Sequence, residues 1–153
     1  MSSPLQPYHA TYLAPSFERA TVGDAMHAGV FACPPEASLR EVAAAMASHR
    51  LHCVTVMAIV ADQADGERLV WGVLSDADLL EAAGSRALDA TAGTLARSEF
   101  LTVEPSQSLE SASRLMAEHR VTHAVVVQPD SERLLGVVSA HDVAGVLAWG
   151  RDA

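Results

Sequence analysis

The sequence contains an internal repeat, and this repeat limits the possible folds more than any other feature. Residues 21–56 align with residues 91–126, and residues 70–80 align with residues 134–144. In the first pair of segments the identical residues recur 70 positions later and in the same order: Thr21, Gly23, Pro35, Ser38, Leu39, Met46, Ala47, His49, Arg50 and Val56. In the second pair Gly72, Val73, Ser75 and Asp78 recur as Gly136, Val137, Ser139 and Asp142. A tandem duplication of about 60 residues predicts two similar units.

Each copy carries the signals of a β-α-β-β-α unit. Pro35 and Pro105 stop the first strand, and Ser38 with Glu41 has the spacing of a capping box, which satisfies two backbone donors at a helix start. In the first copy we expect an opening turn or helix at 21–27, a strand at 30–33, a helix from Ser38, a hairpin of strands 53–60 and 69–74, and a helix from Asp76. In the second copy the corresponding elements are expected at 91–97, at 100–103, from Ser108, at 123–128 with 134–138, and from Ala140. The predicted buried faces of the first helices hold Leu39, Val42, Ala43 and Met46, and Leu109, Ala112, Leu115 and Met116.

This element order predicts an α+β fold. One copy alone would be a three-stranded sheet with helices on one face, so the bare faces of the two sheets are expected to pack together about a pseudo-twofold axis. A ligand would then lie in the cleft between the copies. We divide the chain into an N-terminal arm at 1–20, a first unit at 21–84, a linker at 85–90 and a second unit at 91–149.

Composition excludes several classes of partner. The chain has 153 residues and a formal net charge of −9, and all ten of its bases are Arg. Nucleic acids and anionic membranes demand clustered positive charge, so neither is expected as a partner. No stretch has the length of a signal peptide or a membrane span. Cys33 and Cys53 are too few for a disulfide scaffold, so we expect reduced thiols and a cytoplasmic protein.

Neither catalysis nor a metal site is indicated. The sequence shows no activated Ser or Cys with a placed base and no phosphate-binding loop, so we do not expect an enzyme. His49 and His52, like His119 and His123, straddle a helix end and a strand start, with no Cys pair or carboxylate cluster beside them. A small metal-dependent hydrolase is therefore the least favoured hypothesis.

Three motifs, each present twice and in the same order, resemble those of the CBS domain, and the pair resembles a Bateman module. The motifs are the strand–proline segments 31–35 and 101–105, the His-Arg turns at 49–50 and 119–120, and the Gly-x-x-Ser-x-x-Asp segments that begin at Gly72 and Gly136. The resemblance covers about residues 21–149, which is nearly all of the chain apart from the arm.

The resemblance implies two sites for an adenosine-containing ligand, such as AMP, ADP, ATP or S-adenosylmethionine. By this likeness Asp78 and Asp142 would bind ribose hydroxyls, and Ser75 and Ser139 would lie near a phosphate. The residues implied around the adenines are Val30, Phe31 and Ala32 in one site and Phe100, Leu101 and Thr102 in the other. His52 with Cys53 and Thr122 with His123 occupy the places of basic phosphate contacts in many members. No cofactor is implied.

The chemistry of these residue types agrees with that reading. A carboxylate can accept hydrogen bonds from both hydroxyls of a ribose, and a helix start favours phosphate. The plausible phosphate cations are Arg50, Arg97, Arg120 and His27. The second copy would have more such groups than the first, because Arg97, Arg120 and His123 belong to it.

Two features allow a purely structural role for these motifs, and a third disfavours a phosphate group in the first site. The Ser-x-x-Asp segments can be ordinary helix caps. Gly72 and Gly136 can simply relieve crowding where the hairpin meets the other copy. Asp76 would repel a phosphate beside Ser75, which favours a ligand with little negative charge.

The sequence therefore predicts a stand-alone regulatory module that senses an adenosine-type ligand and reports to an unknown regulated protein through a conformational or dimer change. The alternative is a ligand-free dimerisation or protein-interaction module. The last helix is apolar at Val143, Val146, Leu147 and Trp149, which favours burial against a second copy and hence a homodimer.

Overall fold

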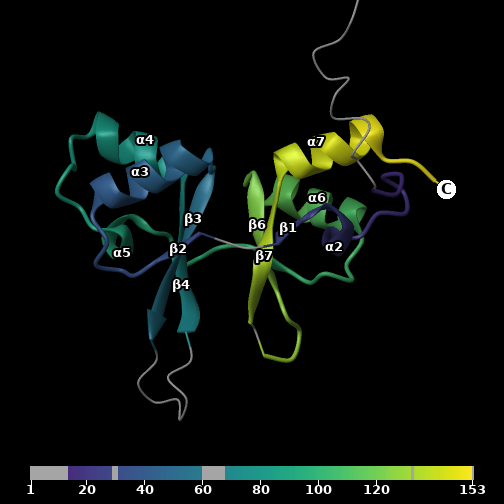
Figure 1. Cartoon of the computed structure of the whole chain (residues 1–153), viewed down its shortest axis with the longest axis horizontal. Coiled ribbons are helices and arrows are strands. Elements are labelled where there is room, and N and C mark those ends of the chain that lie inside the picture. Colours follow the sequence, from purple (N-terminus) through teal and green to yellow (C-terminus); the bar gives the residue numbers. More distant parts are fainter. Residues whose placement is uncertain (1–13, 29–30, 60–67, 132, 153) are drawn as a thin grey trace, which may run out of the picture. The chain divides into compact units, whose positions relative to one another are not determined.

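The computed structural model describes residues 14–28, 31–59, 68–131 and 133–152 (Figure 1). The fold is α+β, with one sheet in each of two compact units. The elements in chain order are α2 (Val22–Ala25), β1 (His27–Ala28), β2 (Ala32–Cys33), α3 (Leu39–His49), β3 (Cys53–Ile59), β4 (Arg68–Ser75), α4 (Asp76–Gly84), α5 (Ala92–Leu95), β5 (Thr102–Val103), α6 (Leu109–Glu118), β6 (His123–Val127), β7 (Leu134–Ser139) and α7 (Ala140–Trp149). The predicted order of elements is confirmed in both copies.

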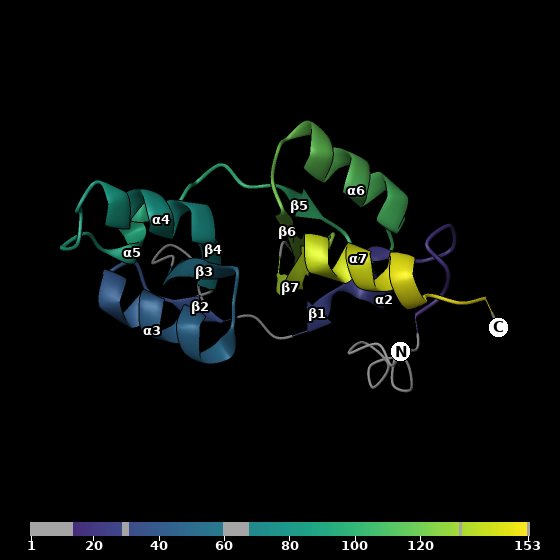
Figure 2. The same cartoon turned by 90° about the horizontal axis from the view of Figure 1, so that it is seen from above.

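The two repeats exchange their opening segments. Among the described residues, unit 1 draws on 14–28, 101–131 and 135–152, and unit 2 draws on 31–59, 68–100 and 133–134. The opening segment of the first repeat therefore lies in the unit that holds most of the second repeat. Figures 1 and 2 show α2 beside α6 and α7. Likewise α5, which opens the second repeat, contacts α4 of the first repeat.

Matching backbone hydrogen bonds hold the two exchanged segments. In unit 1 the Val22 N–H donates to the Gln107 carbonyl at 2.8 Å. In unit 2 the Ala92 N–H donates to the Ala37 carbonyl, also at 2.8 Å. These two pairs stand at the same positions of the repeat, so the exchange is reciprocal.

The sheet of unit 2 has the strand order β2-β3-β4. Strand β2 is parallel to β3, with Cys33 opposite Val56, and β3 is antiparallel to β4, which confirms the predicted hairpin. The sheet of unit 1 has the order β1-β7-β6-β5, where β5 is parallel to β6. Its extra strand, β1, comes from the exchanged segment and is antiparallel to β7.

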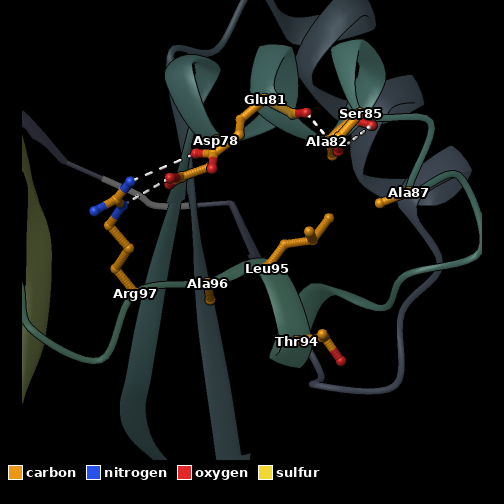
Figure 3. Close-up of a pocket in the computed structure, with 9 residues that line it drawn as sticks. All are labelled: Asp78, Glu81, Ala82, Ser85, Ala87, Thr94, Leu95, Ala96 and Arg97. Atoms are coloured by element: carbon orange, nitrogen blue, oxygen red, sulfur yellow. Dashed lines mark hydrogen bonds and ion pairs between the residues drawn. The ribbon is translucent and has the colours of Figure 1, made fainter.

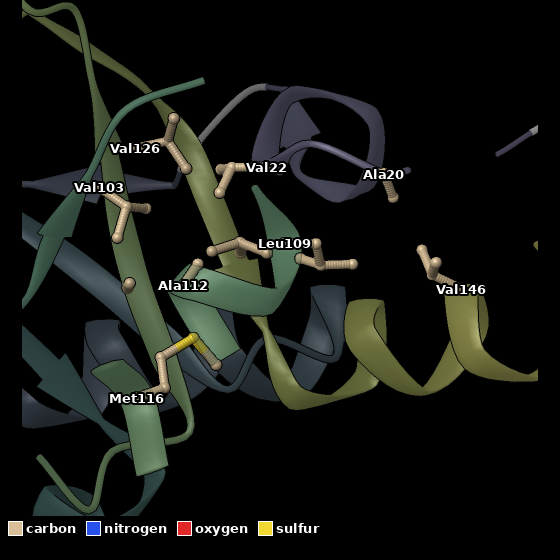
Figure 4. Close-up of a cluster of buried hydrophobic side chains, with 10 residues drawn as sticks. Ala20, Val22, Val103, Leu109, Ala112, Met116, Val126 and Val146 are labelled. Carbon is tan, nitrogen blue, oxygen red and sulfur yellow. The ribbon is translucent and has the colours of Figure 1, made fainter. Parts of the chain in front are cut away.

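Each unit has its own apolar core. The core of unit 1 joins residues from the exchanged segment, the sheet, α6 and α7 (Figure 4). Its buried members are Ala20, Val22, Val103, Leu109, Ala112, Met116, Ala124, Val126, Val138 and Val146. The core of unit 2 holds Ala37, Val42, Met46, Val54, Val56, Leu74 and Ala92. Val22 and Ala92 are both fully buried, so each core is completed by a residue of the exchanged segment.

The predicted helix starts are correct, but one predicted cap is only half formed. The Ser38 hydroxyl accepts from the Glu41 N–H at 3.1 Å, and among the described contacts the Glu41 carboxylate does not return a bond to the Ser38 backbone. A full capping box forms instead where the third helical residue is Asp, at Asp24, Asp78 and Asp142. The shorter Asp side chain folds back onto the cap nitrogen in all three.

The described part of the arm packs on unit 1. Phe17 lies against the core of that unit. The Ser16 hydroxyl donates to Asp152 at 2.7 Å, and the Arg151 N–H donates to the Ala14 carbonyl at 3.0 Å. Residues 14–17 are therefore fixed along the C-terminal end of α7.

Candidate ligand-binding site

The Gly-x-x-Ser-x-x-Asp motif of the first repeat leads into the N-terminus of α4, where Ser75 is the cap residue. Oδ2 of Asp78 accepts from both the backbone N–H and the hydroxyl of Ser75, each at 2.9 Å. In return the Ser75 hydroxyl accepts from the Asp78 N–H at 3.2 Å. Asp78 is only 5% exposed, which is unusual for a carboxylate and places it at the centre of any site here.

Arg97 contacts the other oxygen of this carboxylate. Its Nε lies 2.8 Å from Oδ1 of Asp78, and one terminal nitrogen lies 3.7 Å from the Glu81 carboxylate (Figure 3). Burial acts to raise the pKa of Asp78, but the hydrogen bonds from Arg97 and Ser75, with the charge of Arg97, outweigh it and hold that pKa below its ordinary value. Asp78 is therefore ionised at neutral pH. We call Ser75, Asp78 and Arg97 the first site.

The backbone around Gly72 brings Arg97 to this position. Val73 and Arg97 exchange two backbone hydrogen bonds, at 3.0 and 2.9 Å, which form an isolated antiparallel bridge. A Cβ at Gly72 would lie 2.9 Å from the Arg97 carbonyl oxygen and 3.0 Å from the Cβ of Ala96. A glycine is needed here for the exchanged segment to approach β4, so the crowding interpretation of Gly72 fits the structure.

The second repeat builds a matching arrangement at α7. Oδ2 of Asp142 accepts from the Ser139 N–H at 2.8 Å and from the Ser139 hydroxyl at 3.1 Å. Nδ1 of His27 lies 2.7 Å from Oδ1 of Asp142, in the place that Arg97 takes in the first site. Asp142 is 8% exposed. A Cβ at Gly136 would collide with the His27 carbonyl oxygen. We call Ser139, Asp142 and His27 the second site.

The position of Arg97 corrects one expectation. The sequence placed Arg97 with the second copy as a phosphate cation, whereas its described side-chain contacts are with Asp78 and Glu81 of the first repeat. The exchange of the opening segments is the reason. His27 stands at the repeat position of Arg97, so the alignment identified the pair, but it did not indicate which carboxylate each would meet.

A pocket of about 360 Å³ adjoins the first site (Figure 3). Asp78, Glu81 and Arg97 stand on one side of it, and its remaining wall comes from α4, α5 and the residues between them. That wall is formed by Ala82, Ser85, Ala87, Thr94, Leu95 and Ala96. The volume is at the lower end of the range of small-molecule sites, and the lining combines charged, hydroxyl and apolar side chains.

The residues predicted as phosphate contacts lie close to the helix starts. Nδ1 of His52 is 3.2 Å from Asp76, so the carboxylate that was expected to repel phosphate has a histidine beside it. Burial, together with the charge of Asp76, raises the pKa of the Cys53 thiol to about 11, so this thiol is neutral at pH 7. Cys33 and Cys53 are both free thiols, as expected. In the second repeat the Thr122 hydroxyl lies 3.0 Å from Nδ1 of His123.

The residues predicted around the first adenine are only partly described. Val30 lies outside the described residues. The Phe31 side chain is 39% exposed, and its ring centroid lies 5.3 Å from that of His49. Ala32 is exposed on β2. Neither Phe31 nor Ala32 lines the pocket beside Asp78.

The residues predicted for the second adenine belong to different units. Phe100 falls in unit 2, and Leu101 and Thr102 fall in unit 1. Leu101 packs against the core of unit 1, while Thr102 is exposed on β5. Arg120 is exposed and left-handed, with a φ of 55°, just after α6, and Arg50 takes the equivalent conformation after α3 with a φ of 53°.

The described residues hold neither a cluster of metal-ligating side chains nor a helix suited to span a membrane. No three His, Cys, Asp or Glu side chains gather there as a metal site. Within the same ranges no helix has both the length and the apolar character that crossing a bilayer requires.

Comparison with known proteins gives three related findings. Hypoxic response protein 1 of Mycobacterium tuberculosis is 31% identical over 127 residues, which cover 81% of this chain and 82% of that protein. A crystal structure of Hypoxic Response Protein I with two coordinated zinc ions has a TM-score of 0.62 at 27% identity, and the match covers 82% of this chain and 97% of that one. The CBS domain pair of protein MJ0100, in complex with 5′-methylthioadenosine and S-adenosyl-L-methionine, has a TM-score of 0.73 at 16% identity and covers 84% of this chain and 96% of that one.

The family comparison agrees with the repeat. The CBS domain model matches twice, at residues 22–85 and 92–148, and together these matches cover most of the chain. The two motif carboxylates and the strands of both units fall within the matched ranges. The chain therefore belongs to the CBS domain family and carries two CBS domains.

Proposed function

We propose that this chain is a stand-alone regulatory module that binds an adenosine-containing ligand at Asp78, Asp142 or both. Binding would change the conformation of the module or its dimer, and a separate regulated protein would respond to that change. The module carries out no reaction of its own in this proposal.

The twofold occurrence of a buried carboxylate at a helix start is the observation that carries the proposal. A helix cap needs no burial, and capping aspartates are ordinarily solvated. Asp78 and Asp142 are instead 5% and 8% exposed, and each follows a strand whose Gly leaves room for the backbone of the opening segment that carries Arg97 or His27. A buried, ionised carboxylate is an acceptor pair suited to the vicinal hydroxyls of a ribose.

The charges around the first site favour a ligand with little negative charge. Asp76, Asp78 and Glu81 lie on the first two turns of α4, against the single cation of Arg97 and the ring of His52. Net repulsion of a triphosphate is expected from this balance. Adenosine, 5′-methylthioadenosine and S-adenosylmethionine suit it better than ATP, and the MJ0100 domain pair, which shares the fold, binds the last two of these.

The second candidate is a ligand-free interaction module. Its support is that Arg97 and His27 contact the two motif carboxylates, so both carboxylates have partners within the chain. In that case the capping boxes of Ser75 with Asp78 and of Ser139 with Asp142 serve only to start their helices.

A homodimer is the proposed assembly, and α7 is the proposed contact surface. The exposed positions of this helix, which are Ala140, His141, Ala144, Leu147 and Ala148, include no Asp, Glu, Lys or Arg. Leu147 is 63% exposed. Val146 and Val143, which the sequence assigned to the same surface, instead pack into the core of unit 1. The apolar face available to a partner is therefore narrower than the sequence suggested.

A thermal-shift panel tests the proposed function. The ligands are AMP, ADP, ATP, adenosine, S-adenosylmethionine and NAD, with GTP as the control nucleotide. A ligand at about 100 times its Kd stabilises the folded state by roughly 2.7 kcal/mol. For a chain of this length we expect the Tm to rise by about 5–10 °C with one adenosine ligand and not with GTP.

Two variants assign that rise to the motif. Asp142→Asn keeps a capping side chain but removes the charge, so it should reduce the rise in Tm. Asp130→Asn, which changes an exposed carboxylate in the β6–β7 turn, is the matched control and should leave it unchanged. If no ligand raises the Tm at millimolar concentration, the interaction module becomes the better account.

A further inference from the structure

The hydrogen bonds at Asp78 leave too little room for a ribose. A carboxylate offers about four lone-pair positions, two on each oxygen. Both positions on Oδ2 are filled by the N–H and the hydroxyl of Ser75, and Nε of Arg97 fills one of the two on Oδ1. A vicinal diol that binds through both hydroxyls needs two acceptor positions, and one remains.

The Ser75 bonds and the Arg97 bond differ in how easily they can be given up. The bond from the Ser75 N–H belongs to the capping box, and breaking it would leave a backbone donor at the start of α4 without a partner. The Ser75 hydroxyl is held beside Oδ2 because it accepts from the Asp78 N–H in the same box. The Arg97 side chain is 67% exposed, so its guanidinium can turn into water and keep its hydrogen bonds. Its second contact, with Glu81 at 3.7 Å, joins two exposed groups and holds it weakly.

The backbone of Arg97 nevertheless keeps the guanidinium close to Asp78. The bridge to Val73 fixes the main chain of Arg97 beside β4. A side chain released from Asp78 therefore stays within reach and returns when the carboxylate is vacated. Because Arg97 and Asp78 belong to the same chain, the guanidinium has a high effective concentration at the carboxylate.

We propose that Arg97 is an internal competitor for the ribose hydroxyls at Asp78, which lowers the affinity of the first site and makes ligand binding depend on the release of Arg97. The inference rests on the proposed function and adds the residue that sets affinity at one of its two sites. Arg97 is a positioning residue of the free state in this account, and it is not a phosphate contact.

The second site differs in the chemistry of its competitor. His27 holds the same place on Oδ1 of Asp142. An arginine is a cation at every physiological pH, whereas an imidazole can be neutral and then binds a carboxylate through one N–H without a charge. The competitor at the second site is therefore the weaker one, and that site is expected to fill first.

Calorimetric titration of adenosine into Arg97→Met tests the inference. Adenosine carries the diol but no phosphate, so a lost phosphate contact does not enter the result. An Asp142→Asn background confines binding to the first site. We expect Arg97→Met to bind adenosine at least about fivefold more tightly than its Arg97 parent. The affinity for 2′,3′-dideoxyadenosine, which lacks the diol, should not change.

The matched control is Arg114→Met, which removes an exposed arginine with an ion pair to Glu110 in unit 1. It should leave adenosine affinity unchanged. Arg97→Lys serves as a second variant should Arg97→Met fold poorly, because Lys keeps the charge but lacks the planar fork, and it should give an affinity between those of Arg97 and Met. A direct readout is the NMR signal of the Arg97 Nε–H, which should shift when adenosine saturates the site.

The outcomes separate the inference from the function on which it rests. Equal adenosine affinity in Arg97→Met and its parent overturns the inference and leaves the proposed function standing. Weaker binding of AMP by Arg97→Met with unchanged adenosine affinity also overturns it, because Arg97 would then be a phosphate contact. Absence of binding by either protein, to adenosine or to any other ligand of the panel, removes both.

Discussion

At the scale of single residues, Asp78 combines a structural and a chemical role. It completes the capping box of α4 through Oδ2, and it holds Arg97 through Oδ1. The sequence presented these roles as alternatives, a cap or a ribose acceptor. In the structure Oδ2 accepts from Ser75 and Oδ1 accepts from Arg97, so the cap does not exclude the proposed ligand at Oδ1.

The lowered pKa of Asp78 predicts a pH-dependent stability. The pKa of this carboxyl is lower in the folded chain than in the unfolded chain, where it is about 3.9. Its contribution is therefore present above pH 4 and is lost as the pH falls through the folded pKa. We expect Asp78→Asn to lower the free energy of unfolding by on the order of 1 kcal/mol at pH 7, with the difference shrinking below about pH 4.

Urea unfolding of the parent and of Asp78→Asn at several pH values between 3 and 8 measures this difference. Asp130→Asn is again the control, since this exposed carboxyl lies in a turn away from the helix starts, and it should change stability little at any pH. A difference for Asp78→Asn that stays constant or grows on acidification would contradict the assigned contacts.

At the scale of elements, two glycines permit the exchange of opening segments. Gly72 on β4 and Gly136 on β7 stand where the segments of residues 96–97 and 26–27 run antiparallel beside these strands. A side chain at either position would meet a backbone carbonyl oxygen, which moves less readily than the end of a side chain. These glycines thus place Arg97 and His27 against their carboxylates.

We expect Gly72→Ala to destabilise the fold by roughly 1–3 kcal/mol, because its Cβ would lie 2.9 Å from the Arg97 carbonyl oxygen. It should also weaken the contact between Arg97 and Asp78. The matched control is Gly84→Ala at the end of α4, where a Cβ would have nothing within 4 Å. That change should be neutral or stabilise the helix by up to about 1 kcal/mol.

The midpoint and slope of urea unfolding compare the two variants. Equal free energies of unfolding for Gly72→Ala and Gly84→Ala would mean that the fold does not depend on the close approach of residues 96–97 to Gly72.

At the scale of the whole molecule, each compact unit contains parts of both repeats. A signal that displaces Arg97 acts on a segment that continues directly into unit 1, because the chain passes from unit 2 to unit 1 between Phe100 and Leu101. Under the proposed function, a ligand at Asp78 would therefore act on Arg97, a residue of the second repeat, through a contact within unit 2.

The proposed homodimer gives a prediction at this scale. Leu147→Glu places a charge on the exposed apolar face of α7, so it should raise the Kd of the dimer at least about tenfold, while the Tm of the isolated fold changes little because Leu147 is exposed. Leu88→Glu, at an exposed leucine between α4 and α5, is the matched control and should leave the dimer intact. Light scattering at micromolar concentration measures the mass, and a monomeric parent protein would contradict the assembly.

The sequence by itself determined the local structure of this protein. The repeat, the prolines that end strands and the serines that begin helices predicted nearly every element, because such signals act over a few residues. The motif carboxylates at the starts of α4 and α7 were found in the same way. The error at Ser38 and Glu41 concerned only whether the second bond of a local cap forms.

Only the tertiary structure decided which repeat each opening segment would join. Segments 21–27 and 91–97 are short, and the two repeats offer them matching backbone acceptors, such as the Gln107 and Ala37 carbonyls. A local pattern cannot choose between two equivalent partners, so the contacts of Arg97 with Asp78 and of His27 with Asp142 could not be predicted. These contacts depend on the path of the whole chain, and through them Arg97, which the sequence had assigned to the second copy, becomes part of the first site.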